Sequence, residues 1–294
     1  MCLNGSLDGL DLHLDPMITL QVLLLILGFL LVAVPLLVIL LSAEPYRRGY
    51  FQNDVTLMLP YKEQTISEGL LAGVGFAFIV ATVLIVEVVR DKQGKNVGEK
   101  FLSGSLIPGW VWESYAGIGI FTFGAACQQL TVNSAKYVIG RLRPHFFDLC
   151  QPIPASVSDL NSNGYIQDYT CSNAMADLAR QKDMRLSFPS AHASFAMYTA
   201  VFFIFYIQVK GKWRGSKLLR HGVQFAVLIA AWYVGLSRVA DHMHHWGDVA
   251  VGFAVGAVYA IIVFIYVLKP KKYGIPGSWE TTQPEILPRP VLAR

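Results

Sequence analysis

Residues 237–268 read SRVADHMHHWGDVAVGFAVGAVYAIIVFIYVL, and this stretch decides the fold. Its first part is polar and rich in histidine, whereas its second part, Val249–Leu268, is apolar throughout. An α-helix needs about 20 consecutive apolar residues to cross the hydrocarbon core of a bilayer. The stretch therefore predicts a membrane-spanning helix that begins directly after a cluster of ionisable side chains.

The composition of the whole chain agrees with a membrane protein. Hydrophobic residues make up 54% of the 294 residues and charged residues only 15%, whereas charged residues make up about 25% of a typical soluble domain. The net charge is +4. No polar segment alternates basic with aromatic residues, so we expect no nucleic-acid partner.

Five further apolar segments bring the predicted number of spans to six, so we expect an all-α, polytopic membrane protein. These segments are Met17–Leu41, Gly69–Val89, Tyr115–Val132, Ala193–Val209 and Gly222–Leu236, the last expected to begin earlier, near Leu218. The expected organisation is an N-terminal segment over residues 1–16, a six-helix core over 17–270 and a proline-rich tail over 271–294.

Basic residues in the short connections predict the orientation of the chain. In a six-span topology the second connection, the fourth connection and the C-terminal flank lie on one side, and each of them is rich in Lys and Arg. We therefore expect this side and both termini to be cytosolic. The first loop, Ser42–Glu68, and the third loop, Pro144–Ser187, are then extracellular or lumenal.

Ionisable residues gather at the non-cytosolic ends of three predicted spans, where such side chains are usually functional. The first cluster ends the third span. Lys136 and Arg143 are seven residues apart, about two helical turns, so they share one face of a helix. A basic flank that reaches the lipid headgroups is the alternative, but such flanks are expected on the cytosolic side.

The second cluster, Ser187–His192, precedes the fourth span and contains Pro189, Ser190 and Ala191. Proline and serine favour the start of a helix. The free N–H groups of a helix start bind anions. Taken alone, His192 fits an interfacial histidine as well as a catalytic one.

The third cluster lies in the opening stretch. His244 and Asp248 are four residues apart, so on a helix they share a face. A carboxylate that holds one imidazole nitrogen leaves the other nitrogen free to attack. His245, three residues from Asp248, is the rival nucleophile. The adjacent histidines also suggest a metal site, but no second cluster of carboxylates or cysteines lies on that side.

Together the three clusters supply cations, a helix N-terminus and two well-placed histidines. Phosphoryl transfer needs positive groups around the phosphate oxygens. It also needs a nucleophile on one side of the phosphorus and an acid for the leaving oxygen on the other. This set of residues fits a phosphate monoester as substrate.

The three motifs resemble the signature of the type 2 phosphatidate phosphatase superfamily, which is Lys-x6-Arg-Pro, Pro-Ser-x-His and Ser-Arg-x5-His-x3-Asp. They occur here as Lys136…Arg143-Pro144, Pro189-Ser190-Ala191-His192 and Ser237-Arg238…His244…Asp248. Parts of the first loop, within residues 44–63, are similar to the animal lipid phosphate phosphatases. The resemblance runs from about Met17 to Pro270.

The resemblance implies a role for each matching residue. His244 attacks phosphorus and becomes phosphohistidine, Asp248 orients His244, and His192 protonates the leaving alcohol and then activates water. No metal or other cofactor takes part, so activity is expected to be independent of Mg²⁺. The residues implied in phosphate binding are Lys136, Arg143, Arg238, Ser190 and, through the N–H groups beside Ser190, Ala191.

The resemblance also implies the substrates and the location. Animal members accept phosphatidate, lysophosphatidate, sphingosine 1-phosphate and ceramide 1-phosphate. We expect an integral protein of the plasma membrane, with the endoplasmic reticulum and the Golgi as alternatives, and a homo-oligomer is left open. The active site would lie at the non-cytosolic ends of the third, fourth and sixth helices.

Three other functions are alternatives to this one. A phosphatase for polyprenyl or sugar phosphates uses the same motifs, but the first loop favours the lipid enzymes. An inactive relative that serves as an interaction protein would lose Lys136 or His244, and both are present. A transporter would carry its charges along a path through the midplane, whereas these charges lie at span ends.

Three further expectations follow from particular residues. Ala191 stands where the family usually has Gly, and we expect activity to survive this change. Cys150 and Cys171 lie in the third loop on the oxidising side of the membrane, so they are a candidate disulfide, with two free thiols as the alternative. Gly252 and Gly256 continue the stripe of His244 and Asp248, which we expect to face the bundle interior.

Overall fold

The structure of the protein is a computed structural model that describes residues 16–95, 100–102, 105–155, 164–174, 176–211 and 217–268. Apart from Pro16, the predicted N-terminal segment lies outside the described residues, as does the predicted tail over residues 271–294.

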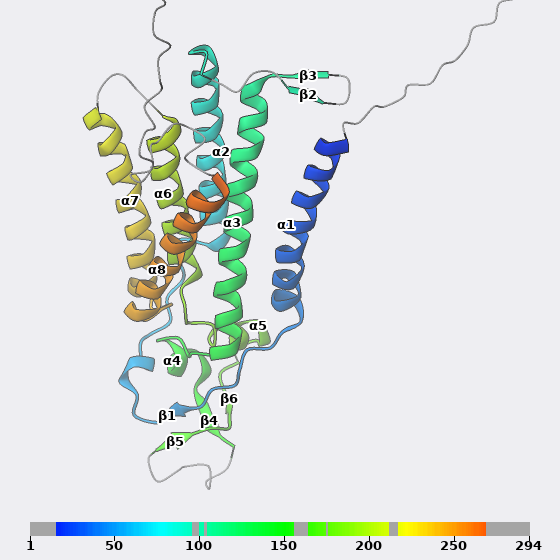
Figure 1. Cartoon of the computed structure of the whole chain (residues 1–294). Helices are drawn as coiled ribbons and strands as arrows, with labels where there is room; N and C mark the ends of the chain where they lie inside the picture. The colour runs from blue at the N-terminus through cyan, green and yellow to red at the C-terminus, as the bar shows by residue number, and fades with distance from the viewer. Residues whose placement is uncertain are drawn as a thin grey trace, which may run out of the picture.

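Six long helices dominate the described part of the chain and run side by side (Figure 1). They are α1 (Pro16–Ser42), α2 (Glu68–Lys92), α3 (Gly109–Ile139), α6 (Ala191–Lys210), α7 (Lys217–Ala240) and α8 (Trp246–Ile262), and α8 continues as the π-helix Val263–Leu268. Each covers one predicted span, so the mostly helical fold is confirmed. The third helix is longer than predicted at both ends, and it stops where Gly140 adopts a left-handed conformation.

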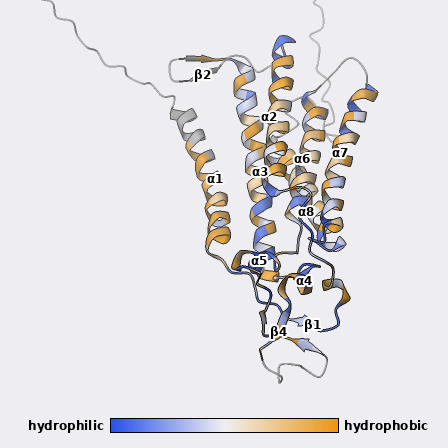
Figure 2. Ribbon diagram, turned by 180° about the vertical axis from the view of Figure 1, so that it is seen from behind, coloured by the Kyte–Doolittle hydropathy of each residue, from blue (hydrophilic) through white to orange (hydrophobic). Residues whose placement is uncertain are grey.

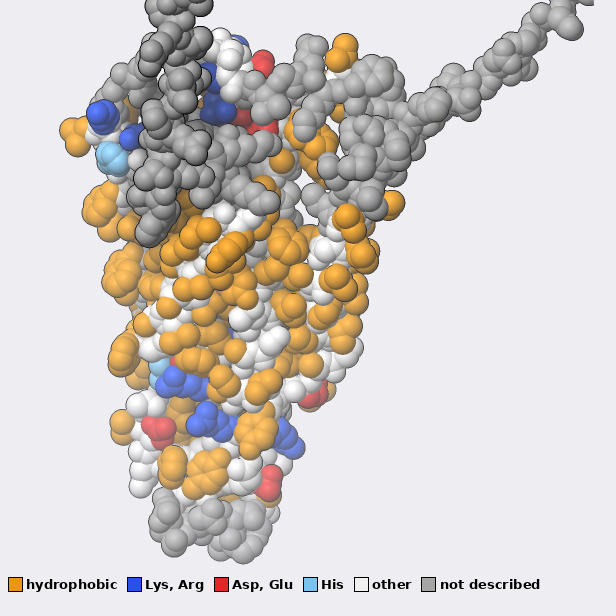
Figure 3. All heavy atoms as spheres, viewed as in Figure 1, with side chains coloured by type: hydrophobic (Ala, Val, Ile, Leu, Met, Phe, Trp, Pro, Cys, Tyr) orange, Lys and Arg blue, Asp and Glu red, His pale blue; other side chains and the backbone are white. Residues whose placement is uncertain are grey.

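Four of the described helices are long and apolar enough to cross a membrane: α2, α6, α7 and the helix Trp246–Val267. The apolar part described for α1 is shorter, Ile26–Ser42, and α3 carries the polar residues Gln128, Gln129 and Asn133. Much of each long helix has the orange colour of hydrophobic residues in Figure 2. Hydrophobic side chains also cover the middle of the face seen in Figure 3. An integral membrane protein follows, while the number of six spans stays a prediction.

Helix α6 is the centre of the bundle and packs against α2, α3, α7 and α8. Its aromatic side chains Tyr198, Phe202 and Tyr206 are buried, and Phe121 of α3 packs on the first two. Glycines let α8 approach α6 closely. A Cβ atom on Gly252 would lie 2.6 Å from the carbonyl oxygen of Ser190. The two glycines of the predicted stripe therefore face α6 inside the bundle, whereas His244 precedes α8 and does not continue the stripe.

The first and third loops fold together at one end of the bundle (Figure 1). Their short elements are β1 (Tyr50–Phe51), a 3-10 turn (Val55–Leu57), α4 (Phe146–Cys150), β4 (Pro152–Pro154), β5 (Tyr165–Ile166), β6 (Tyr169–Cys171) and α5 (Leu178–Asp183). Antiparallel pairing joins β1 to β5 and β4 to β6. The predicted disulfide between Cys150 and Cys171 is present and ties α4 to β6. The hairpin of β2 (Lys100–Leu102) and β3 (Ser105–Ile107) lies at the opposite end.

A buried ionic cluster joins three helices at the end of the bundle that carries β2 and β3. Lys210 of α6 donates to Glu87 of α2 at 2.7 Å and to Glu113 of α3 at 2.8 Å. The hydroxyl of Tyr206 also donates to Glu87, at 2.6 Å. Buried charges need partners of this kind, so the cluster fixes α2, α3 and α6 relative to one another, far from the end that carries the three motifs.

Candidate active site

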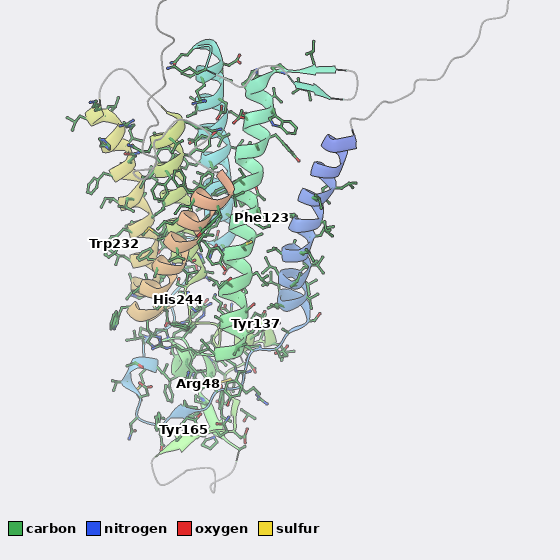
Figure 4. All side chains as sticks on the ribbon, viewed as in Figure 1. Arg48, Phe123, Tyr137, Tyr165, Trp232 and His244 are labelled. Atoms are coloured by element: carbon green, nitrogen blue, oxygen red, sulfur yellow. A yellow bond between two sulfur atoms is a disulfide. The ribbon has the colours of Figure 1, made fainter. Side chains whose placement is uncertain are left out.

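The three sequence motifs meet where the helices reach the folded loops. Lys136 lies near the end of α3, His192 in the first turn of α6, Arg238 near the end of α7, and Asp248 in the first turn of α8. Figure 4 shows His244 and Tyr137 at this same end of the bundle. Residues more than 100 positions apart in the sequence are thus brought to one site.

His244 sits in the short turn that joins α7 to α8. The N–H groups of Met243 and His244 both donate to the carbonyl oxygen of Arg238, at 3.0 and 3.3 Å, and hold the turn. The Nδ1 atom of His244 lies 2.5 Å from the carbonyl oxygen of Ser187. A carbonyl only accepts, so Nδ1 carries the proton and Nε2 keeps its lone pair.

The surroundings keep the imidazole of His244 uncharged. Its side chain is 2% exposed. Burial, followed by the positive charges of Arg143 and Lys136, lowers the pKa of His244 well below its ordinary value. A neutral imidazole with a free Nε2 is the form that attacks phosphorus.

Asp248 does not hold His244 directly, contrary to the prediction. Its Oδ2 atom lies 4.0 Å from Nδ1 of His244, too far for a hydrogen bond. The carboxylate instead accepts from the Ser187 hydroxyl at 2.6 Å and from Arg141 at 2.6 Å. It also accepts from the backbone N–H of His245 at 3.1 Å, as in a capping box. Asp248 reaches His244 only through Ser187.

His245, the rival nucleophile, contacts Asp248 directly. Its Nδ1 atom lies 3.2 Å from Oδ2 of Asp248, closer than that of His244. With Arg48 and Arg141 it lines a cavity of about 470 Å³ that contains none of the predicted phosphate-binding residues. The carboxylate therefore pairs with His245, whereas the charges of Lys136 and Arg143 act on His244.

The three predicted phosphate-binding cations differ in how they are held. Lys136 is buried, and its ammonium group forms no hydrogen bond or ion pair with any described residue. Arg143 pairs with the Asp183 carboxylate at 2.5 Å. Arg238 pairs with the Asp241 carboxylate at 2.9 Å. Lys136 is thus the cation whose charge is left for a ligand.

The start of α6 has the form expected of an anion site. Ser190 is the N-cap, and its hydroxyl oxygen accepts from the N–H of Ala193 at 3.4 Å. The N–H of Ser190 itself donates to the carbonyl oxygen of Asp248 at 3.0 Å, so it is not available. The N–H groups of Ala191 and His192 have no partner among the described residues. These two donors point to anion binding at the N-terminus of a 20-residue helix.

His192 is buried beside Lys136, and the two line a common cavity of about 280 Å³. Its Nε2 atom lies 3.2 Å from the carbonyl oxygen of Ile66. Because that oxygen accepts, Nε2 carries the proton. To act as a general acid, His192 needs a second proton on Nδ1, because a neutral imidazole does not readily give up its N–H proton.

Residues 59–67 of the first loop, here called the strap, cross the site and were not foreseen as part of it. The carbonyl oxygen of Ile66 accepts from both His192 and Arg238, the latter at 3.0 Å. Thr65 donates to the Asp241 carboxylate through its N–H at 2.9 Å and its hydroxyl at 2.7 Å. The sequence signals were the first-loop resemblance and Asp241, an unassigned acid inside the third motif.

A metal site was one alternative for the adjacent histidines. Within the described ranges, no group of three or more His, Cys, Asp or Glu residues is placed to hold a metal ion. Independence from metal stays a prediction for the assays below.

Comparisons with known proteins agree with the motifs. Residues 117–272 match the family described as the PAP2 superfamily. A Drosophila melanogaster protein named putative phosphatidate phosphatase is 41% identical over 244 residues, which cover 79% of this chain and 64% of the fly protein. The chain thus matches less than two thirds of the fly protein's length.

Two mouse proteins are matched over more of their length. Phospholipid phosphatase 2 of Mus musculus is 39% identical over 253 residues, covering 84% of this chain and 85% of the mouse protein. Phospholipid phosphatase 1 of the same species is 38% identical over 238 residues, covering 81% of each. No solved structure matches the chain.

Proposed function

The chain belongs to the PAP2 superfamily, and on that premise we propose that it is a membrane phosphatase that removes phosphate from lipid phosphate monoesters. The proposed substrates are phosphatidate, lysophosphatidate, sphingosine 1-phosphate and ceramide 1-phosphate. The observation that carries the proposal is the buried, neutral His244, with Nε2 free, in the field of Lys136 and Arg143.

In the first step His244 displaces the lipid alcohol. Nε2 of His244 forms a bond to phosphorus while the bond from phosphorus to the ester oxygen breaks. His192, protonated on both ring nitrogens once the negatively charged phosphate is bound, gives its Nε2 proton to the departing oxygen, so His192 becomes neutral and the lipid leaves as a neutral alcohol. The charges of Lys136, Arg143 and Arg238 stabilise the phosphoryl oxygens during the transfer.

In the second step water frees the enzyme. His192, now without its proton, takes one from a water molecule, and the oxygen of that water attacks phosphorus. The phosphorus–nitrogen bond breaks, inorganic phosphate leaves, and His244 returns to its neutral form. Both steps balance without an added oxidant, reductant or metal ion.

The substrate also has to replace contacts that the strap makes. The Ile66 carbonyl oxygen holds the Nε2 proton of His192 and one nitrogen of Arg238. The leaving oxygen and a phosphate oxygen would take these two places. Both new acceptors carry more negative charge than a carbonyl oxygen, so the exchange is favourable.

The proposed location follows from the Lys and Arg distribution. The end of the bundle that carries the site would face the extracellular or lumenal side, and both termini would be cytosolic. The plasma membrane is the proposed membrane, with the endoplasmic reticulum and Golgi as alternatives. A six-span topology is part of this proposal.

The test is a phosphate-release panel with the purified full chain in neutral detergent. Lipid phosphate monoesters and isoprenyl phosphates are compared, with excess EDTA and no added Mg²⁺. We expect release from the lipid monoesters, inhibition by vanadate, and no release by His244→Ala. Strict dependence on Mg²⁺ would contradict the mechanism, and release from isoprenyl phosphates alone would contradict the substrate class.

A further inference from the structure

The cavity that His192 and Lys136 share is polar at one end and apolar at the other. Glu68, Gln129 and Asn133 line it together with these two residues. Leu71 and Phe195 continue the wall and also line a second, apolar cavity of about 250 Å³ between α2, α6 and α7. The charged side chains of the first cavity suit a phosphate, its other polar side chains suit the polar backbone of a lipid, and the second cavity suits a hydrocarbon tail.

Glu68 is the unexpected member of this cavity. It is the first residue of α2, directly after the N-cap Ser67, and it forms no hydrogen bond or ion pair with any described residue. An acidic residue in the first turn of a helix is favourable in itself. The charge of Glu68 acts over a longer distance on Lys136 and Arg238. In a cavity that serves a phosphate, however, a carboxylate without a close partner repels the ligand unless the ligand also carries a positive charge.

Gln129 and Asn133 add one free donor and one free acceptor. The side-chain nitrogen of Asn133 donates to the carbonyl oxygen of Gln129 at 2.8 Å and to its Oε1 at 3.3 Å. This leaves Nε2 of Gln129 and Oδ1 of Asn133 without a partner among the described residues. Both atoms suit a ligand that carries hydroxyl or amino groups.

We infer that this cavity receives the leaving alcohol and that Glu68 makes it selective for amino-alcohol phosphates, whose ammonium group sits on the carbon next to the ester carbon. The inference rests on the proposed function and narrows its substrate class. The phosphate would lie at Lys136 and the ammonium at Glu68. A long-chain base 1-phosphate has this chemistry, whereas its N-acylated form has lost the positive charge.

The experiment compares these two lipids at equal chain length in the same detergent. The catalytic efficiency, kcat/KM, is measured for wild type, Glu68→Gln and the control Asp168→Asn. Asp168 lies between β5 and β6, and its exposed carboxylate forms no hydrogen bond or ion pair with a described residue and does not line the cavity. The melting temperature of each variant shows that it is folded.

We expect Glu68→Gln to lower kcat/KM for the amino lipid about three- to tenfold, the size of a partly exposed ion pair. The N-acylated lipid should be unaffected or improved, and Asp168→Asn should leave both unchanged. An equal effect of Glu68→Gln on both lipids, or none on either, overturns the selectivity while the phosphatase activity stands. If wild type hydrolyses neither lipid but releases phosphate from phosphatidate, the inference falls and the proposed function stands; if it releases phosphate from none of the three, both fall.

Discussion

Asp248 and His244 stand 4.0 Å apart, and Ser187 joins them with two different groups. Its hydroxyl donates to the carboxylate of Asp248 at 2.6 Å, and its carbonyl oxygen accepts from Nδ1 of His244 at 2.5 Å. The orientation of the nucleophile thus depends on the backbone of Ser187. Asp248 fixes that backbone in place and does not touch the imidazole.

Removing the Ser187 hydroxyl should therefore impair catalysis although it leaves the carbonyl contact possible. We expect Ser187→Ala to lower kcat about tenfold, since small errors in position are costly for a nucleophile. KM should change little, because Ser187 supplies no charge to the phosphate. Ser172→Ala is the matched control, since this hydroxyl bonds only to the Gln151 carbonyl oxygen in the third loop. Equal rates in Ser187→Ala and Ser172→Ala would show that the Ser187 hydroxyl does not help to position His244.

The strap should affect activity through the two hydrogen bonds that Thr65 donates to Asp241. Thr65→Val keeps the shape of the side chain but loses its hydroxyl bond to Asp241. Asp241 would then hold Arg238 less firmly, so we expect kcat/KM to fall about tenfold, mainly through a higher KM. Thr65→Ser restores the hydroxyl and should restore KM. If Val and Ser at this position behave alike, the hydroxyl bond has no role in placing Arg238.

Acid should destabilise the loops around the site through His145. This residue is buried, its Nδ1 atom lies 2.9 Å from the His242 carbonyl oxygen, and burial lowers its pKa to about 4. The unfolded chain, with an ordinary pKa of about 6.5, binds more protons between these values. Stability is therefore complete above pH 6.5 and falls as the pH drops toward 4, by roughly 2 kcal/mol at pH 5.

The measurement is the melting temperature in detergent between pH 7 and pH 5. His145→Asn keeps a donor for the carbonyl oxygen but removes the titrating group, so its melting temperature should fall less steeply than that of wild type. His221→Asn, on α7, is the control and should follow wild type. Parallel curves for wild type and His145→Asn would exclude His145 as the cause.

The contact between α8 and α6 positions the two catalytic motifs against each other. A side chain at Gly252 would meet the carbonyl oxygen of Ser190, a backbone atom at the start of α6. We expect Gly252→Leu to lower activity on the order of 100-fold per folded molecule. Ala254→Leu, on the exposed side of the same helix, should have little effect. Wild-type activity in Gly252→Leu would show that this contact does not position the site.

Local sequence patterns predicted the elements of this fold well. Apolar runs predicted the six long helices because burial in lipid or in the bundle requires them. The start of α6 after Ser190 followed from capping chemistry. The extra turns of α3 were missed because they carry polar residues, Glu113 before the predicted span and Asn133 and Lys136 after it, although such side chains remain compatible with a helix.

Contacts between segments far apart in the chain could not be predicted from the sequence. The spacing of His244 and Asp248 suggested one helix face, but α8 begins only at Trp246 with His245 as its N-cap. His244 therefore lies outside the helix, and the four-residue spacing does not apply to it. The strap contacts described above join residues 126 to 176 positions apart, and no local pattern predicts a pairing over that distance.

The central claim is that His244, not His245, carries the phosphoryl group, and covalent trapping tests it most directly. A His192→Ala variant of the full chain, given a substrate labelled in its phosphate, should accumulate the intermediate because the residue that activates water is missing. Acid-labile label on the peptide that contains His244, absent in the double variant with His244→Ala, is the predicted result. Label that persists in that double variant and is lost with His245→Ala would contradict the account.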